Sequence, residues 1–170
     1  MPITTSDLLI RLSGGSGNTD PNLSLGGVMS TSTVVTDNVT HNLFDQVTGT
    51  ESSAGDIEYR GVYLLNNHGT LSATSTKTYI SSNTSSTDTS LDIALAGEGV
   101  NVTMETIANE DTAPAGETFS QPSTYATGLS MGTLTAGQRF GQWIRRTVNI
   151  GAAAVNDDTA TLKFDCDTAA

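Results

Sequence analysis

The stretch GDIEYRGVYLLNN, residues 55–67, decides the fold. It opens on a Gly-Asp pair and runs into a second turn signal, Asn-His-Gly, and its large residues alternate as they do in a β-strand. Successive strand side chains point to opposite faces, which gives two sets: Tyr59, Gly61, Tyr63 and Leu65 on one face, and Arg60, Val62 and Leu64 on the other. Because both sets contain apolar residues, we expect residues 58–66 to form a central strand that is buried on both sides.

Strand-like runs separated by turns continue to the end of the chain. Further strands are expected at TSTKTYISS (74–82), LDIALAG (91–97), VNVTMETIAN (100–109), the apolar piece LSMGTL, residues 139–150 and TATLKFDCDT (159–168). No helix is predicted, because the alanine-rich stretch GAAAVNDD (151–158) is too short to form one. Short strands without intervening helices predict an all-β, antiparallel sandwich of about seven strands over residues 55–170.

Residues 1–54 depart from this pattern. A short strand is expected at residues 8–12, but the apolar side chains that follow keep neither the period of a strand nor that of a helix. Ordering residues 13–33 costs roughly 20–40 kcal/mol of backbone entropy. Burial of Leu23, Leu25, Val28 and Met29 returns only about 6–12 kcal/mol. The sequence therefore predicts an extended N-terminal arm over residues 1–54 that is mobile until a neighbouring subunit holds it.

The composition excludes several classes of partner. The formal net charge is -11 at pH 7, with only seven Lys and Arg among 170 residues. A basic surface is needed to bind phosphates, and an acidic one repels nucleic acid and anionic membranes, so we expect neither as a direct partner. The single cysteine, Cys166, excludes an intrachain disulfide framework and is expected as a small buried side chain. No signal-peptide pattern and no membrane-spanning run is seen, so we expect synthesis in a cytoplasm without export by that route.

Side chains suited to catalysis or metal binding are few and scattered. His41 and His68 are distant in the chain, and each is interpreted as a turn residue at the surface. Acidic residues suited to calcium lie in or beside expected loops: Glu110, Asp111, Asp157, Asp158, Asp165 and Asp167. They lack the Asp-x-Asp-x-Asp-Gly spacing of a calcium loop, so calcium binding stays an open alternative. We predict no enzymatic activity and no cofactor.

Arg145 and Arg146 are consecutive residues of one expected strand. Their guanidinium groups should therefore diverge to opposite faces. Two interpretations stay open. In one, both residues lie at the surface and protect a sheet edge. In the other, one guanidinium, with Arg145 as the candidate, reaches an acidic group across a subunit interface, and the other guanidinium lies over an aromatic ring.

Several pieces of the chain resemble small virion structural proteins of tailed bacteriophages. They are LIRLSGG, NTDPNLSLGG, NLFDQVTGTESSAGDIEYRGVYLLNN and TLTAGQRFGQWIRRTVNIGAAAVNDDTATLKFDCDT, and residues 55–67 and 134–147 are the most specific. The turns at residues 66–69 and 134–138 also resemble those of immunoglobulin-like modules. The resemblance implies an immunoglobulin-like sandwich that acts as a capsid decoration, or cement, protein, and it implies no catalytic residue.

We therefore expect a non-enzymatic protein on the outer capsid surface of a virion, made in the host cytoplasm. As a homo-oligomer it would bind and stabilise the shell of the major capsid protein, by burying arm side chains and by strand pairing. The expected interface residues are Leu23, Leu25, Val28, Met29, Leu43, Phe44 and Arg145. Two alternatives stay open: a tail or baseplate component, and a carbohydrate-binding or adhesin module that uses Tyr79, Tyr125 and Trp143.

Overall fold

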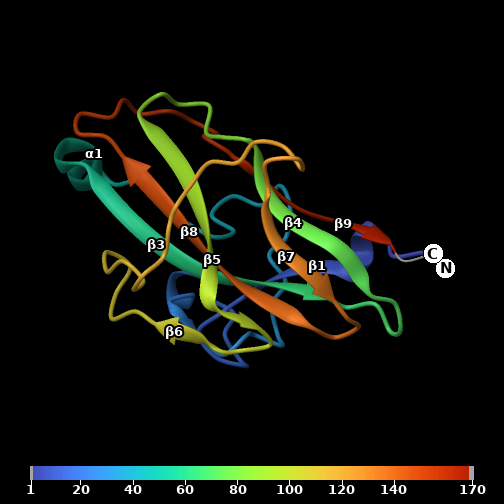
Figure 1. Ribbon diagram of the computed structural model, residues 1–170. Helices are drawn as coiled ribbons and strands as arrows, with labels where there is room; N and C mark the ends of the chain where they lie inside the picture. The colour runs from blue at the N-terminus through green and yellow to red at the C-terminus, as the bar shows by residue number, and fades with distance from the viewer. Residues whose placement is uncertain (1, 169–170) are drawn as a thin grey trace.

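Three antiparallel sheets make up the fold in the computed structural model, which describes residues 2–168 (Figure 1). The main sheet has the order β1-β3-β8-β5, the small sheet β7-β4-β9, and β2 pairs with β6. The strands are β1 (Leu8–Leu12), β2 (Gly26–Gly27), β3 (Asp56–Asn66), β4 (Ala73–Ser82), β5 (Thr89–Val100), β6 (Met104–Thr106), β7 (Leu129–Leu134), β8 (Arg139–Val148) and β9 (Thr161–Thr168). The nearly all-β, antiparallel architecture is confirmed, and a strand lies in each region where the sequence predicted one.

Strand β3 is the central strand that residues 55–67 predicted. It pairs with β1 on one side and with β8 on the other, and Gly61 lies opposite Trp143. Residues 58–66 are buried throughout. Both faces of β3 are therefore covered, as the apolar side chains on each face require.

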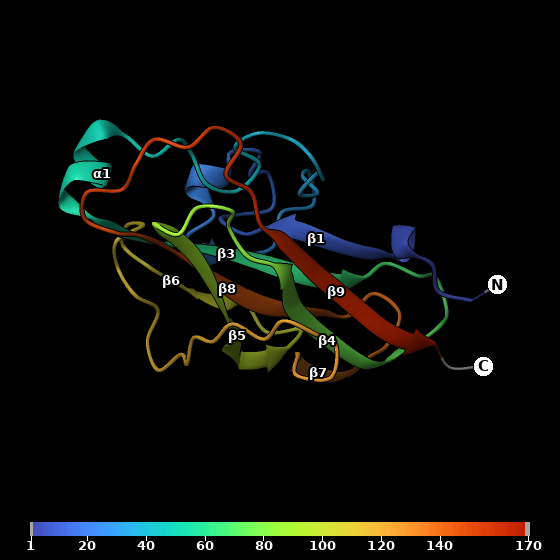
Figure 2. The same ribbon diagram turned by 90° about the horizontal axis from the view of Figure 1, so that it is seen from above.

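The two faces of the main sheet pack into different layers. On one face, Val62 and Ile144 contact side chains of the small sheet such as Ile80, and Figure 2 shows β1 next to β9 where the two sheets meet. On the other face, Tyr63 and Trp143 pack with β6 and with residues of the N-terminal region. The main sheet is thus the middle layer of the molecule.

The N-terminal segment, residues 13–47, folds back onto the main sheet and is not an extended arm; residues 25–29 pack on the second face, and residues 43–44 pack on the first. Ser13 donates its backbone N–H and its hydroxyl to Gly61 O of β3, and its hydroxyl oxygen accepts the N–H of Gly26. Gly26 has a φ of +87°, and a Cβ there would lie 1.8 Å from Glu105 O, so only glycine permits this approach to β6. The entropy argument failed because it counted apolar burial alone, whereas buried polar residues such as Asn18 and Ser30 also hold the segment.

A short helix, α1 (Gly49–Ala54), contradicts the prediction of no helix. Thr48 and Glu51 form a capping box, in which each side chain accepts the other's backbone N–H. Gly55 ends the helix with a φ of +77°, a conformation that glycine adopts without strain. The pattern Thr-x-x-Glu was the sequence signal for this helix.

The strand order differs from that of an immunoglobulin domain. The seven strands of five or more residues, lettered A to G in chain order, form the sheets A-B-F-D and E-C-G. Immunoglobulin constant domains pair A, B, E and D in one sheet and C, F and G in the other. Here strand F, which is β8, occupies the place of strand E, so the sandwich is shared but the expected topology is not.

Candidate functional site

A buried cluster of charges lies at one end of the main sheet. Glu58 and Arg60 are alternate residues of β3, and Arg146 of β8 lies opposite Glu58. All three side chains are buried. Glu58 forms an ion pair with Arg146, and Arg60 pairs with Glu110, which satisfies the general requirement that buried charges have partners.

The same cluster fastens residues 44–45 to the sheet. The ring of Phe44 lies 5.0 Å from the guanidinium carbon of Arg146 and 5.4 Å from that of Arg60. Arg146 also donates a hydrogen bond of 2.6 Å to the backbone oxygen of Asp45. Burial raises the pKa of Glu58 to about 7, and this effect outweighs the lowering by Arg146 and Arg60.

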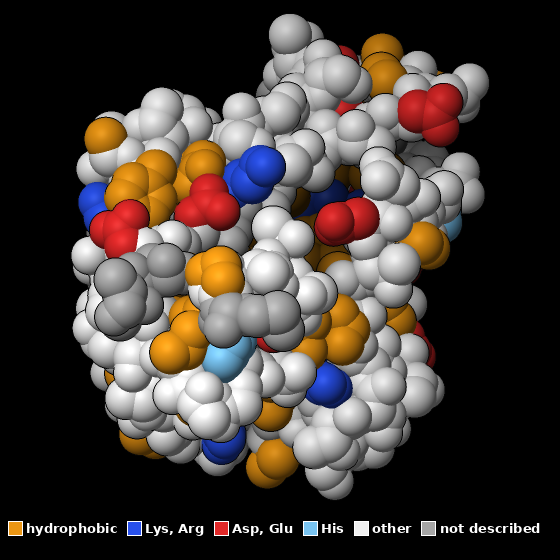
Figure 3. Space-filling model, turned by 90° about the vertical axis from the view of Figure 1, so that its right-hand side faces the viewer, with side chains coloured by type: hydrophobic (Ala, Val, Ile, Leu, Met, Phe, Trp, Pro, Cys, Tyr) orange, Lys and Arg blue, Asp and Glu red, His pale blue; other side chains and the backbone are white. Residues whose placement is uncertain are grey.

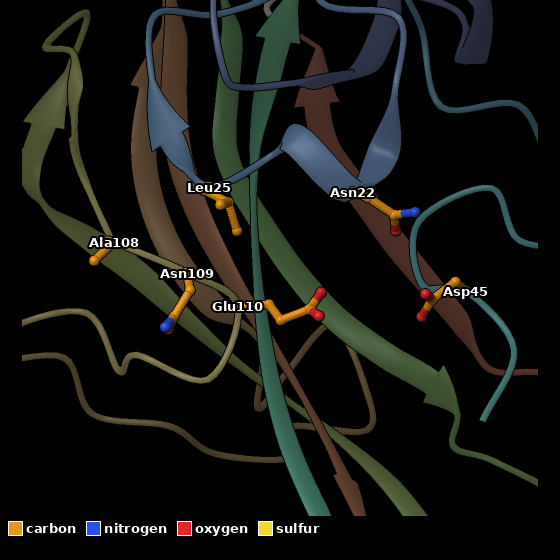
Figure 4. A pocket seen from close by; sticks show the side chains of 6 residues that line it. All are labelled: Asn22, Leu25, Asp45, Ala108, Asn109 and Glu110. Atoms are coloured by element: carbon orange, nitrogen blue, oxygen red, sulfur yellow. The ribbon is translucent and has the colours of Figure 1, made fainter. Parts of the chain in front are cut away.

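A pocket of about 290 Å³ opens beside this cluster (Figure 4). It lies where β1 no longer covers the edge of β3, since Tyr59 N–H there donates to Glu110 O. Its lining consists of Asn22, Leu25, Asp45, Ala108, Asn109 and Glu110. Figure 4 shows the carboxylates of Asp45 and Glu110 and the amide of Asn22 around one opening, a set that accepts hydrogen bonds from a cationic or amide group.

The six apolar residues predicted for an interface do not share one environment. Leu25 and Met29 pack against the cluster around Trp143, and Leu43 and Phe44 pack against the cluster around Val62. Leu23 is 59% exposed and Val28 is 49% exposed. Only these two of the six are largely exposed, whereas the other four are partly buried; Val39, which the sequence argument missed, is exposed as well.

Arg145 makes its contacts within the chain. Its guanidinium pairs with Asp92 of the neighbouring strand β5 at 3.0 Å and lies 4.9 Å from the ring of Phe119. Arg146 contacts a different set of residues, Glu58 and Asp45, as the predicted divergence of the two side chains requires. Both arginines belong to β8, which lies between β3 and β5, so they protect no sheet edge.

The remaining candidates are dispersed. Trp143 is fully buried, whereas Tyr79 and Tyr125 are only partly buried and belong to the region of the small sheet. The Nδ1 atom of His68 accepts two backbone N–H groups of its own turn, which agrees with a turn residue. Cys166 is half-buried at the margin of the core.

Three of the six acidic residues considered for calcium, Glu110, Asp158 and Asp165, accept hydrogen bonds from protein groups. Asp158 accepts hydrogen bonds from Thr89 and Ser86, which lowers its pKa despite partial burial, and Asp165 accepts one from Tyr79. Within residues 2–168, no three His, Cys, Asp or Glu side chains are placed to hold a metal ion. The helices of this part of the chain are also too short to cross a bilayer.

Sequence reasoning missed the cluster of Glu58, Arg60 and Arg146, although a signal for it existed. Two charged residues in a strand predicted to be buried on both faces must find partners of opposite charge. An acid and a base in that strand, and an arginine pair in another, were therefore the signal for a buried ion-pair network.

The fold and these surfaces define an antiparallel β-protein with a paired charge cluster and a folded-back N-terminal segment. No protein-family model, curated protein or solved structure matches the chain.

Proposed function

We propose that this chain is a non-enzymatic structural protein of a tailed-phage virion that decorates the capsid. It would bind the outer surface of the shell formed by the major capsid protein and reinforce that shell. The resemblance of residues 55–67 and 134–147 to such virion proteins suggests the class. The observation that supports the docking role is that some side chains of the N-terminal segment are packed on the core while others are exposed to solvent.

The N-terminal segment alternates between side chains that anchor it and side chains that face solvent. Leu25 and Met29 are packed on the chain's own core. Leu23, which precedes them, and Val28, which lies between them in the chain, are exposed. An anchored segment meets a partner at a lower entropic cost than a mobile one, because its backbone is already ordered. Burial of two such side chains contributes about 1.5–3 kcal/mol each.

The pocket lined by Asn22 and Leu25, which flank Leu23 in the chain, supplies a polar complement to these apolar groups. Asp45 and Glu110 at its opening pair with Arg146 and Arg60, and their remaining oxygen atoms fit a lysine or arginine of the partner, while Asn22 and Asn109 add amide groups. The net charge of -11 favours a partner with a basic docking surface and speeds the encounter. The proposed contact thus joins an apolar anchor to an acidic pocket.

The test compares binding of two surface variants of the full chain to particles that lack this protein. The variant Leu23→Asp/Val28→Asp should lose binding, and Val155→Asp, which places a charge at another exposed valine, should bind like the unchanged chain. Sedimentation of the particles with the purified chains measures both. Equal binding of the two variants would refute docking through the N-terminal segment, and no binding of the unchanged chain would refute the capsid role.

A tail or baseplate position is the alternative within the same class. Copy number per particle distinguishes the two positions, since decoration of a shell requires hundreds of copies and a baseplate far fewer. Light scattering of the purified chain tests the expected homo-oligomer.

A further inference from the structure

The outer face of the small sheet carries two tyrosines among charged and hydroxyl side chains. Thr78 and Ile80 of β4 point to the core, so Lys77 and Tyr79 point outward. On β9, Phe164 points inward and Asp165 outward. Figure 3 faces the side of the molecule where the chain ends and shows hydrophobic-coloured, acidic and basic side chains close together there.

Tyr79 is tied to the neighbouring strand at this face. Its hydroxyl donates a hydrogen bond of 2.6 Å to Asp165, which lies opposite Lys77 and not opposite Tyr79. The ring therefore leans diagonally across the sheet toward β9, whereas an unrestrained strand side chain stands upright. Tyr79 is only partly buried, so part of its side chain stays accessible to solvent.

Tyr125 is fixed at the same face from a loop. Its hydroxyl donates a hydrogen bond of 2.6 Å to Ser75 O of β4. The ammonium group of Lys77 lies 5.1 Å from the centre of its ring and donates to Ala126 O at 3.3 Å. Lys77 and Tyr79 are two residues apart on β4 and point to the same face, so their Cα atoms are about 6.6 Å apart.

We propose that this face, formed by Tyr79, Tyr125, Lys77, Asp165 and Asp167, binds neutral pyranose residues of a glycan. The two rings would stack against the C–H faces of sugar rings, and the flanking carboxylates and ammonium would bind their hydroxyl groups. Rings that are already fixed by hydrogen bonds lose little entropy when a ligand stacks on them. This inference does not depend on the proposed capsid role.

The composition of the face favours a sugar over a protein partner. The cores of protein interfaces are depleted of Lys, Asp and Ser, the residues that surround the two tyrosines here. Lys77 and Lys163 balance Asp165 and Asp167, so the face has no excess of positive charge, and the net charge of -11 disfavours sulfated or carboxylated sugars. A neutral, polyhydroxylated ligand satisfies both constraints.

The experiment is saturation-transfer NMR on the full-length chain. The neutral probes are the methyl pyranosides of glucose, galactose, mannose and N-acetylglucosamine with their tetrasaccharides, and the anionic probe is a heparin tetrasaccharide. We expect transfer to at least one neutral probe. Tyr79→Ala and Tyr125→Ala should each weaken its affinity by about tenfold or more, the effect of removing one stacked ring.

Two further variants separate loss of the site from loss of the fold. Tyr79→Phe keeps the ring but removes the hydrogen bond to Asp165, so it should retain most of the binding. Leu23→Asp/Val28→Asp alters a different surface and should bind the probe like the unchanged chain. No transfer to any neutral probe, transfer to the anionic probe alone, or affinity unchanged in both alanine variants would overturn the proposal.

Discussion

Glu58 and Arg146 lie opposite each other on β3 and β8, and their side chains form a buried ion pair. The same guanidinium contacts the ring of Phe44 and the backbone of Asp45. The pair therefore connects the two middle strands of the main sheet, near one end, to the N-terminal segment. Stability of the sheet and attachment of that segment should respond together to changes at either residue.

Replacement of Arg146 by methionine should destabilise the protein strongly. The variant leaves Glu58 without the arginine with which it forms the closest ion pair, and breaking a buried pair costs about 3–5 kcal/mol. Replacement of both residues, as Glu58→Leu/Arg146→Met, should recover much of that loss because no buried charge is left unpaired; Asp45, which also pairs with Arg146, is half-exposed. Urea denaturation of the three chains measures the free energies of unfolding, and a double variant as unstable as the single one would contradict this view.

The pH dependence of stability should carry the signature of Glu58. Its pKa is about 7 in the folded chain and 4.5 in the reference state, so between these values the folded state binds more protons than the unfolded state. The free energy of unfolding should therefore fall as pH rises from 4.5 to 7, by at most about 1.4 kcal/mol per pH unit from this group.

The variant Glu58→Gln isolates that contribution, because the other carboxyl groups titrate equally in both chains. The difference in free energy of unfolding between Glu58→Gln and the unchanged chain should grow in favour of the variant over that range. Denaturation at pH 5 and at pH 7.5 tests the sign. A constant difference at both pH values would show that Glu58 keeps an ordinary pKa.

The sequence carried the main features of the sandwich. The alternation around Tyr63 predicted a central strand, because apolar side chains on both faces of a strand require both faces to be buried. The order of the strands was not predictable in the same way. Nothing local in β8 specifies that it pairs with β3 and β5, since that choice depends on packing between distant residues such as Gly61 and Trp143.

The packing of the N-terminal segment could not be predicted from the sequence for a related reason. Its attachment depends on buried polar groups, such as Ser13 bonded to Gly61, whose partners are distant in the chain. In a sequence, serine and asparagine indicate an exposed loop. That they are buried and hydrogen-bonded can be recognised only when their partners in the fold are known. Of the candidate interface residues, Leu23 and Val28 are exposed, while Leu25 and Met29 are packed inside by the same folding back.

Two glycines of the N-terminal segment should differ sharply in their tolerance of alanine. Gly26→Ala introduces a Cβ against Glu105 O at a φ of +87° and should cost about 3 kcal/mol or more. Gly17→Ala is the matched control, because no atom lies within 4 Å of the added Cβ, and its effect should stay within about 0.5 kcal/mol. Thermal unfolding of both variants gives the comparison, and equal melting temperatures would contradict the close approach of Gly26 to β6.

The chain that begins at residue 55 should fail to fold cooperatively. Removal of residues 1–54 takes away β1, which covers the edge of β3 at Val62 and Leu64, and it uncovers the face on which Tyr63 and Trp143 are now buried. A chain of 116 residues that exposes one face of its middle sheet loses a core that isolated sheets need for stability. Circular dichroism and urea denaturation of residues 55–170 and of the full chain measure this, with proteolysis by thermolysin as a second readout. A cooperative transition of the shorter chain at an unchanged midpoint would show that residues 55–170 are an independent domain, and the contacts of Ser13 and Leu25 would then contribute little to stability.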